Sequence, residues 1–343
     1  MWRVLITSTT FSKAAPESVR ALQGAGIEVV FTSAGRRLED HELASLLGEV
    51  DGIIAGVDRI GPRSLAAGLP RLKVIARYGV GYDSIDVATA TEFGIVVTNT
   101  PDANSASVAD LVFGLMLVLA RHIVEADRAI REDRWGRFLG CELFGKRLGV
   151  IGFGRAGKAV ARRAGGFGMD VFAFDTAWDE GTARELGVRL SSPEAILEEC
   201  DFVSLHVPDR PETHHLIGEL ELKRMKSTAY LINTSRGGIV DERALVRALR
   251  EGWIRGAALD VFEREPASDP EILTAPNLLL TPHLGACTSE AGARMGRMAV
   301  ENLLAVLQGH RPPHVVNPGV YARQQLGLVA HRLQGSCGPG DSQ

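Results

Sequence analysis

Residues 148–157 read L-G-V-I-G-F-G-R-A-G, an apolar run that ends in the pattern G-x-G-x-x-G at Gly152, Gly154 and Gly157. The Ala- and Arg-rich stretch that follows is typical of a helix, so the pattern lies between a strand and a helix. The first glycine permits a tight turn, the second lets backbone N–H groups approach a pyrophosphate, and the third lets helix and strand pack closely. The helix N-terminus, with Arg155 and Ala156, then faces the phosphates. This stretch predicts the first turn of a dinucleotide-binding sheet.

A carboxylate follows at the spacing that such sites use. The strand-like run D-V-F-A-F (170–174) leads into Asp175, which follows Gly157 at close to the ~20-residue spacing of an acid that binds both ribose hydroxyls. A carboxylate repels a 2′-phosphate, and Thr176 and Ala177 add no cation beside it. The sequence therefore predicts NAD rather than NADP. A glycine-rich turn in a nucleotide-free α/β domain is the alternative.

Strand-like and helix-like segments alternate along most of the chain, a pattern typical of βαβ units around parallel sheets. Two series of strands are expected, at 3–6, 27–31, 52–55, 74–76 and 96–99, and at 147–151, 170–174, 202–206, 229–233, 256–259 and 278–281. A long helix is predicted over 107–132, a second over 288–308, and an extended return strand from 311. The Gly- and Ser-rich residues 319–343 are expected to be disordered.

Composition excludes several classes of function. The 343 residues are 45% hydrophobic and 23% charged, and 38 basic against 42 acidic residues give a net charge of −4 without a basic block for nucleic acid. The most apolar stretch, 111–120, is shorter than the ~20 residues of a membrane span, and the N-terminus lacks a signal-peptide pattern. Four cysteines without a C-x-x-C pair favour a reducing compartment over a disulfide framework or a metal site. We expect a cytoplasmic protein.

Three polar residues each follow a strand-like run of the second series: Arg236, Glu265 and His283. The carboxyl ends of parallel strands are where ligands bind in such folds. Hydride transfer between an alcohol and nicotinamide needs a group that exchanges the hydroxyl proton, and histidine suits both directions. The glutamate would orient the imidazole and stabilise its cation, while the arginine would hold a substrate carboxylate and polarise the reacting oxygen. Each residue alone is more often structural or solvated, but together they predict a dehydrogenase.

With these residues in view, the chain resembles the D-isomer-specific 2-hydroxyacid dehydrogenase family. Besides the glycine motif, the resemblance is carried by A-R-Y-G-V-G-Y-D-S-I-D (76–86), N-T-P-D-A-N-S-A-S-V-A-D (99–110), L-I-N-T-S-R-G-G-I-V-D (231–241), A-L-D-V-F-E-R-E-P (258–266) and L-T-P-H-L-G-A (280–286). It implies an α/β fold of two Rossmann-like doubly wound domains. An NAD-binding domain, 102–285, would be inserted into a flavodoxin-like substrate domain, 1–101 and 286–318. It also implies a homodimer that forms through the long helix near 107–130.

The resemblance assigns roles by position. His283 matches the family's acid/base, Glu265 its paired carboxylate, and Arg236 its substrate-anchoring arginine. The substrate carboxylate would be held by the backbone at Val80 and Gly81, with Asn104 nearby. Further cofactor contacts are implied for Arg155, Ala156, His206, Val207, Pro208, Thr234, Asp260 and Gly285, with Asp260 at the nicotinamide carboxamide.

Within the family the chain is most similar to D-3-phosphoglycerate dehydrogenases, because Arg77 and Arg137 match positions that present arginines to the phosphate. Gly56 stands where those enzymes typically have another arginine. The expected substrate is a small anionic D-2-hydroxy or 2-keto acid with a second anionic group. The alternatives are a glyoxylate/hydroxypyruvate-type or phosphonate-analogue dehydrogenase and, in another class, a non-catalytic NAD-sensing corepressor-like protein. Cys287, four residues after His283, is interpreted as a small buried residue.

Overall fold

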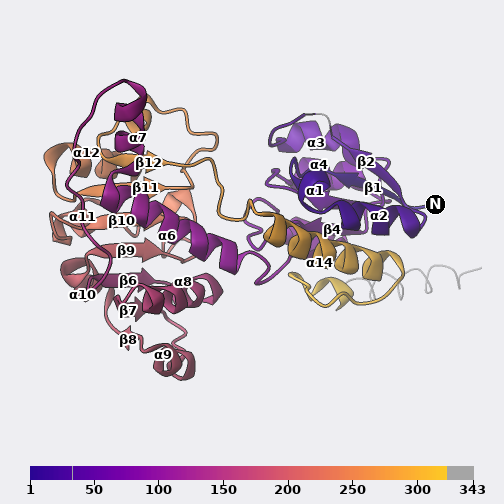
Figure 1. Cartoon of the computed structure of the whole chain (residues 1–343). Helices are drawn as coiled ribbons and strands as arrows, with labels where there is room; N and C mark the ends of the chain where they lie inside the picture. Colours follow the sequence, from indigo (N-terminus) through magenta and orange to yellow (C-terminus); the bar gives the residue numbers. More distant parts are fainter. Residues whose placement is uncertain (33, 323–343) are drawn as a thin grey trace, which may run out of the picture. The chain divides into compact units, whose positions relative to one another are not determined.

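The computed structural model describes residues 1–32 and 34–322 (Figure 1). The described chain forms two compact units, Met1–Asn104 with the residues from Thr288 onward, and Ser105–Cys287. The second unit therefore interrupts the first in sequence. The units divide at 104/105 and 287/288, against the expected 101/102 and 285/286.

The first unit is built on a parallel sheet in the order β2-β1-β3-β4-β5. Its strands are β1 (Arg3–Ile6), β2 (Glu28–Phe31), β3 (Gly52–Ala55), β4 (Val74–Arg77) and β5 (Val96–Thr98). Its helices are α1 (Phe11–Ala14), α2 (Pro16–Gly24), α3 (Asp40–Leu47), α4 (Pro62–Gly68), α5 (Val87–Glu92) and α14 (Ser289–Leu307). This strand order is the flavodoxin-like one, in which ligands bind beyond the carboxyl ends of the strands.

Helix α14 brings the chain back to the first sheet. A Cβ on Gly292 would lie 2.3 Å from the Cβ of Ala14, so the helix approaches α1 more closely than a side chain allows. Asn302, fully buried on α14, donates from Nδ2 to the carbonyl of Asn99 at 3.0 Å. These contacts join residues that are far apart in sequence, which is why the first unit is discontinuous.

The segment after α14 differs from the expected return strand. It makes a single antiparallel bridge, between Val315 and Thr98, rather than a strand. The side chain of Asn317 replaces strand pairing, since its Oδ1 accepts from the N–H of Val97 at 2.8 Å. Val320 is fully buried, so the expectation of disorder from 319 onward is wrong for 319–322. Residues 323–343 of the expected tail lie outside the described residues.

The second unit is built on a seven-stranded parallel sheet in the order β12-β11-β10-β9-β6-β7-β8. Its strands are β6 (Arg147–Ile151), β7 (Asp170–Phe174), β8 (Arg189–Leu190), β9 (Phe202–Leu205), β10 (Tyr230–Asn233), β11 (Gly256–Leu259) and β12 (Leu278–Leu280). Its helices are α6 (Ser105–Arg121), α7 (Ile123–Arg131), α8 (Arg155–Gly166), α9 (Glu180–Leu186), α10 (Pro193–Glu199), α11 (Glu219–Arg224), α12 (Glu242–Glu251) and α13 (Pro270–Leu273), with a 3₁₀ turn η1 (Gly237–Ile239). This is the doubly wound order of dinucleotide-binding sheets, extended by one strand. The predicted fold class is confirmed.

The predicted long helix is in fact two helices. α6 packs its buried Val112 and Met116 into the core of the second unit, then ends at Arg121. His122 adopts a left-handed backbone conformation (φ 53°), and α7 leaves at an angle of 61°. Among the described residues, no single helix has the length and apolar character of a membrane span, although this bent pair has them jointly.

Candidate active site

The glycine turn after β6 has the shape that a dinucleotide requires. Gly152 has φ +98°, and a Cβ there would lie 2.6 Å from the carbonyl of His206. A Cβ on Gly157 would lie 2.0 Å from the carbonyl oxygen of Gly152, so the first turn of α8 rests directly on the loop. A Cβ on Gly154 would meet no atom within 4 Å. Two glycines are therefore required by packing, and the third leaves the helix N-terminus open to a phosphate.

The residues after β9 support this turn from the other side. The N–H of His206 donates to the carbonyl of Ile151 at 2.7 Å, and its Nε2 lies 2.8 Å from the hydroxyl of Ser204. Burial lowers the pKa of His206 to about 4, so the imidazole is neutral at physiological pH. Val207 also lies against Gly152, and the carbonyl of Pro208 accepts from a side-chain hydroxyl in the same loop. Their expected contacts with the cofactor stay predictions.

Asp175 lies directly beyond β7, beside the glycine turn. Its Oδ2 accepts from the N–H of Phe153 at 2.7 Å, and its Oδ1 accepts from the N–H of Ala177 at 2.8 Å. The carboxylate is thereby fixed at the edge of the sheet where a ribose would lie.

A cation that sequence reasoning missed lies in the same region. Lys158, on the first turn of α8, places Nζ 5.7 Å from the ring centroid of Phe153 and 2.5 Å from the Oδ2 of Asp179. This hydrogen bond holds the pKa of Asp179 well below its usual range. The residues directly after Asp175, Thr176 and Ala177, carry no cation, as expected. Helix α8 supplies one, Lys158, which is already paired with Asp179.

The strand ends of β11 and β12 bring Glu265 and His283 together. Both carboxylate oxygens of Glu265 lie close to Nδ1 of His283, at 3.1 and 3.0 Å. His283 has φ +54°, and its N–H donates to the carbonyls of Asp260 and Thr281. The imidazole is 40% exposed, so Nε2 can meet a substrate while Nδ1 faces the carboxylate. This is the geometry of a general acid/base held in one orientation by a carboxylate.

Asp260 positions the loop that carries His283. Its side chain is fully buried, and its Oδ1 accepts from the Thr281 hydroxyl at 2.6 Å and from the Leu284 N–H at 2.7 Å. Its Oδ2 accepts from the N–H of Gly285 at 2.8 Å. The structure thus gives Asp260 a role in fixing the backbone around His283. Its expected contact with the nicotinamide carboxamide, and that of Gly285 with the cofactor, stay predictions.

Arg236 lies just beyond β10, immediately before the turn η1. Its carbonyl accepts from Nδ2 of Asn233 at 2.7 Å, and its Nη1 donates to the carbonyl of Ser235 at 2.6 Å. Two residues earlier, the hydroxyl of Thr234 is buried without a partner among the described residues. A buried hydroxyl costs about 1–3 kcal/mol when it has no hydrogen bond. Thr234 therefore fits a polar group of a bound nicotinamide cofactor.

The loop after β4, in the first unit, presents backbone donors. Its carbonyls are all engaged: that of Gly79 accepts from Thr100 N–H, that of Val80 from Asn99 Nδ2 at 2.8 Å, and that of Gly81 from Arg77 Nε at 2.7 Å. Within residues 1–32 and 34–322, the N–H groups of Val80 and Gly81 find no acceptor. The loop therefore offers two N–H donors to an anion, as the resemblance implies.

Arg77 is bonded to the backbone around it, and its expected contact with a second anion stays a prediction. Besides Gly81, its guanidinium donates through Nη1 to the carbonyls of Ala55 (3.2 Å), Gly56 and Tyr78 (3.0 Å). The side chain thus bonds to backbone carbonyls at the ends of β3 and β4. Arg77 holds the loop that presents the donors.

The exposure and surroundings of three other residues named from the sequence are as follows. Arg137 is exposed on the segment between α7 and β6, and no hydrogen bond joins it to the triad in the part of the chain that the structure describes. Asn104 is half-buried at the end of the first unit. Cys287 is exposed rather than buried, because it lies at the very end of the second unit, where its thiol donates to the carbonyl of His283 at 3.6 Å. Among the described residues, no group of three or more His, Cys, Asp or Glu side chains could hold a metal ion.

Comparison with known proteins agrees with this geometry. The family model for "D-isomer specific 2-hydroxyacid dehydrogenase, NAD binding domain" matches residues 113–285. A glyoxylate reductase of Korarchaeum cryptofilum is 50% identical over 258 residues, covering 73% of this chain and 78% of that protein. A D-3-phosphoglycerate dehydrogenase of Methanocaldococcus jannaschii is 41% identical over 332 residues, covering 96% of this chain but 62% of that protein. A solved structure from Thermus thermophilus superposes with a TM-score of 0.83 at 40% identity, covering 92% of this chain and 99% of the other.

The parallel sheet, the glycine turn and the Arg–Glu–His strand ends define an NAD-dependent oxidoreductase. The chain belongs to the D-isomer-specific 2-hydroxyacid dehydrogenase family. The predicted family, enzyme class and cofactor are confirmed.

Proposed function

We propose that this enzyme reduces a small 2-keto acid of the glyoxylate/hydroxypyruvate type to the D-2-hydroxy acid. The observation that carries this proposal is the bonding of Arg77, whose Nε and Nη1 donate to four backbone carbonyls. These bonds give Arg77 a structural task on the carboxylate-binding loop, which supports an acid without a second anionic group. Glyoxylate reductases among the relatives, 50% identical over 258 residues and 41% identical over 326 residues, also support the proposal.

The residues on the strand ends of the second unit perform the proton chemistry. The glycine turn and Asp175 would hold NADH, which would supply hydride chemistry at the keto carbon. His283 donates the proton on Nε2 to the keto oxygen, and Glu265 balances the resulting charge change on the imidazole through Nδ1. The Arg236 guanidinium would stabilise the negative charge that develops on the oxygen. In the reverse direction His283 accepts the hydroxyl proton.

The test compares glyoxylate, hydroxypyruvate and phosphohydroxypyruvate as substrates of the wild type and of Arg77→Gln. We expect the wild type to favour the two unphosphorylated acids in kcat/KM. We expect Arg77→Gln to lose activity equally on all three, because it loosens the carboxylate-binding loop. Arg59→Gln, an exposed arginine near the same strand ends, is the matched control and should change nothing. A loss confined to the phosphorylated acid would overturn the assignment.

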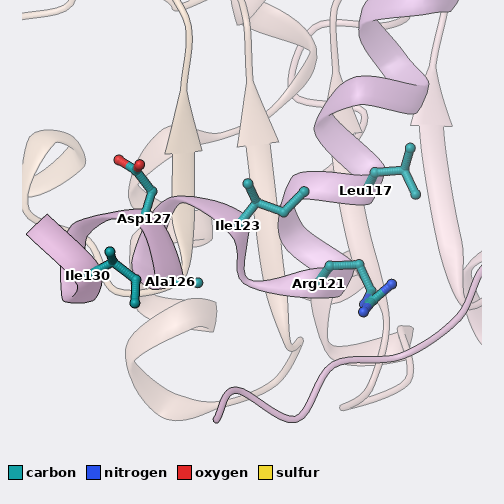
Figure 2. A pocket seen from close by; sticks show the side chains of 6 residues that line it. All are labelled: Leu117, Arg121, Ile123, Ala126, Asp127 and Ile130. Atoms are coloured by element: carbon teal, nitrogen blue, oxygen red, sulfur yellow. The ribbon is translucent and has the colours of Figure 1, made fainter. Parts of the chain in front are cut away.

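We also propose that the enzyme acts as a homodimer. α7 and the segment after it expose large apolar side chains, among them Ile123 (48%), Ile130 (55%) and Trp135 (90%). A cavity of about 580 Å³ lies beside α7. Figure 2 shows the side chains that line it, Leu117, Arg121, Ile123, Ala126, Asp127 and Ile130. Monomers rarely leave an apolar patch of this kind to water, and a second copy would cover it. Light scattering should give a dimer mass, and Ile130→Glu should reduce it; a monomeric wild type would contradict this.

A cytoplasmic location is proposed on the cysteines. The three described ones, Cys141, Cys200 and Cys287, are all unpaired. Free thiols are typical of a reducing compartment. Cell fractionation with antibody detection tests this.

A further inference from the structure

The loop that carries Glu265 is bonded to a second polar group that the chemistry above does not use. The N–H of Glu263 donates to Oε1 of Glu242 at 2.9 Å, and the N–H of Glu242 donates back to Oε1 of Glu263 at 3.2 Å. His215 adds its Nε2 to the same Glu263 oxygen at 3.0 Å. The Glu263 carboxylate, on the Glu265 loop, thus bonds both to the first turn of α12 and to the loop after β9.

The same histidine is bonded to the segment that carries Arg236. Its backbone N–H donates to the carbonyl of Gly238 at 2.7 Å, within the turn η1. A Cβ on Gly237 would lie 1.8 Å from the carbonyl carbon of Phe262, so this turn and the Glu265 loop have touching backbones. Through its backbone and its side chain, His215 therefore connects the two segments that hold two of the three catalytic residues.

The conformation of His215 is one that a side chain seldom adopts. Its φ is +51°, in the left-handed region, where non-glycine residues are uncommon. His214 stacks on it with ring centroids 4.2 Å apart, and pairs with Asp209 at 3.2 Å. Gly238 accommodates this arrangement, since a Cβ there would lie 2.2 Å from the Asp209 carboxylate.

Stability alone does not account for this arrangement. The side chains of His215 and Glu263 are 39% and 38% exposed, and even a fully charged exposed pair contributes only about 0–1 kcal/mol to folding. An unusual backbone conformation costs of order 1–3 kcal/mol and tends to occur where geometry matters for function. The contacts of His215 reach the loop of Glu265 two residues away from the carboxylate that faces His283.

We infer that His215 is a positioning residue for hydride transfer. By holding Glu263 and the carbonyl of Gly238 together, it fixes the Glu265 loop against the Arg236 turn. The Glu265 carboxylate then stays centred on Nδ1 of His283. The inference deepens the proposed function and rests on the enzyme's 2-keto acid reduction, whatever the side chain of the acid.

The experiment compares three variants with the wild type in steady-state kinetics across pH. His215→Ala removes the bond to Glu263 and should lower kcat about fivefold, with the KM for NADH unchanged; fivefold corresponds to about 1 kcal/mol, the worth of one modest hydrogen bond. His215→Gln places an amide nitrogen where Nε2 lies, and should restore kcat to within about twofold. His214→Ala removes the stacked ring but leaves the bond to Glu263 intact, and is the matched control.

The pH profile separates positioning from simple destabilisation. In His215→Ala the acidic limb of kcat should move in the same direction as in Glu265→Gln, whereas loss of stability alone leaves the limb in place. The inference is overturned if the limb and kcat of His215→Ala match the wild type, if glutamine does not restore kcat, or if His214→Ala shows the same loss. The kcat of each variant is compared with that of the wild type on whichever 2-keto acid the wild type reduces. Poor activity on glyoxylate would then count against the proposed substrate and not against His215.

Discussion

Replacing Asp175 by Asn should relax the preference for NADH over NADPH. The Asp175 carboxylate accepts backbone N–H groups from Phe153 and Ala177, which hold it beside the glycine turn. An asparagine keeps the shape and one carbonyl acceptor but loses the charge. NADPH should gain affinity because its 2′-phosphate no longer meets a fixed anion, whereas NADH should lose a little through the weaker ribose contact.

The magnitude follows from the position of the side chain. Two unit charges about 4 Å apart repel by about 1 kcal/mol in water and by about 4 kcal/mol at an effective dielectric constant of 20. Asp175 is half-buried, so its environment lies between these limits. Relief of about 1.5–3 kcal/mol corresponds to a change of roughly ten- to a hundredfold in the ratio of the two dissociation constants.

Fluorescence titration of NADH and NADPH against each variant measures the two constants without turnover. Asp170→Asn is the matched control, because it removes the same charge at the opposite end of β7, where Asp170 pairs with Arg189 at 3.3 Å. Its ratio should equal that of the wild type. The reasoning is refuted if the wild type binds NADPH as tightly as NADH, or if Asp175→Asn weakens both cofactors equally and leaves the ratio unchanged.

Three further outcomes are expected. His283→Ala should lower kcat by roughly 10²–10⁴-fold while fluorescence titration shows NADH affinity retained; a smaller loss would remove it as the acid/base. Asp179→Asn should release Lys158 and raise the affinity for NADPH above that of the wild type. This gain in affinity should vanish when Lys158→Gln is added; if it persists, Lys158 is not its source. Burial lowers the pKa of His206 to about 4. Between about pH 4 and 6.5 the unfolded chain therefore binds a proton at this residue that the native state does not bind. Urea unfolding should show the free energy of unfolding falling as pH falls through that window, by up to about 1.4 kcal/mol per pH unit. His206→Gln should flatten that slope.

The strands of both sheets could be predicted because parallel sheets are buried on both faces. β3 and β11 are continuous apolar or small-residue runs, as is β6 after its first residue Arg147, and the observed bounds of all three equal the expected ones. β8 could not be found in this way. It consists of two exposed residues at the sheet edge, Arg189 and Leu190, which carry neither an apolar run nor an alternating pattern.

The break between α6 and α7 had no signal in the sequence either. His122 adopts its left-handed conformation without a glycine to mark it, and the same is true of His215 and His283. Tertiary contacts hold these residues in a region that the local sequence disfavours. Six described non-glycine residues have a positive φ; of these, His283 belongs to the site and His215 contacts Glu263 on the loop of Glu265.

The meeting of Glu265 and His283 could be predicted because each follows a strand, and strand ends converge at one edge of a parallel sheet. The residues that hold the triad could not. Asp260 binds the loop of His283, and Glu263 binds the loop of Glu265, through hydrogen bonds between segments that are distant in sequence. Nothing in the spacing of the chain indicates which backbone N–H a buried carboxylate will meet.

The hydrogen-bond partners of Arg77 could not be predicted from the sequence either. Its charge and position suggested direct contact with a substrate anion, but a guanidinium has five N–H donors and bonds to whatever acceptors lie nearest. At the end of β4 these are the carbonyls of Ala55, Gly56 and Tyr78, together with that of Gly81 across the turn. The carbonyls of the loop are bonded, while the N–H groups of Val80 and Gly81 find no acceptor within residues 1–32 and 34–322. Under the proposed function, the positive charge would act on the substrate through the backbone that it orders, and two such donors would suit the single carboxylate of a small 2-keto acid.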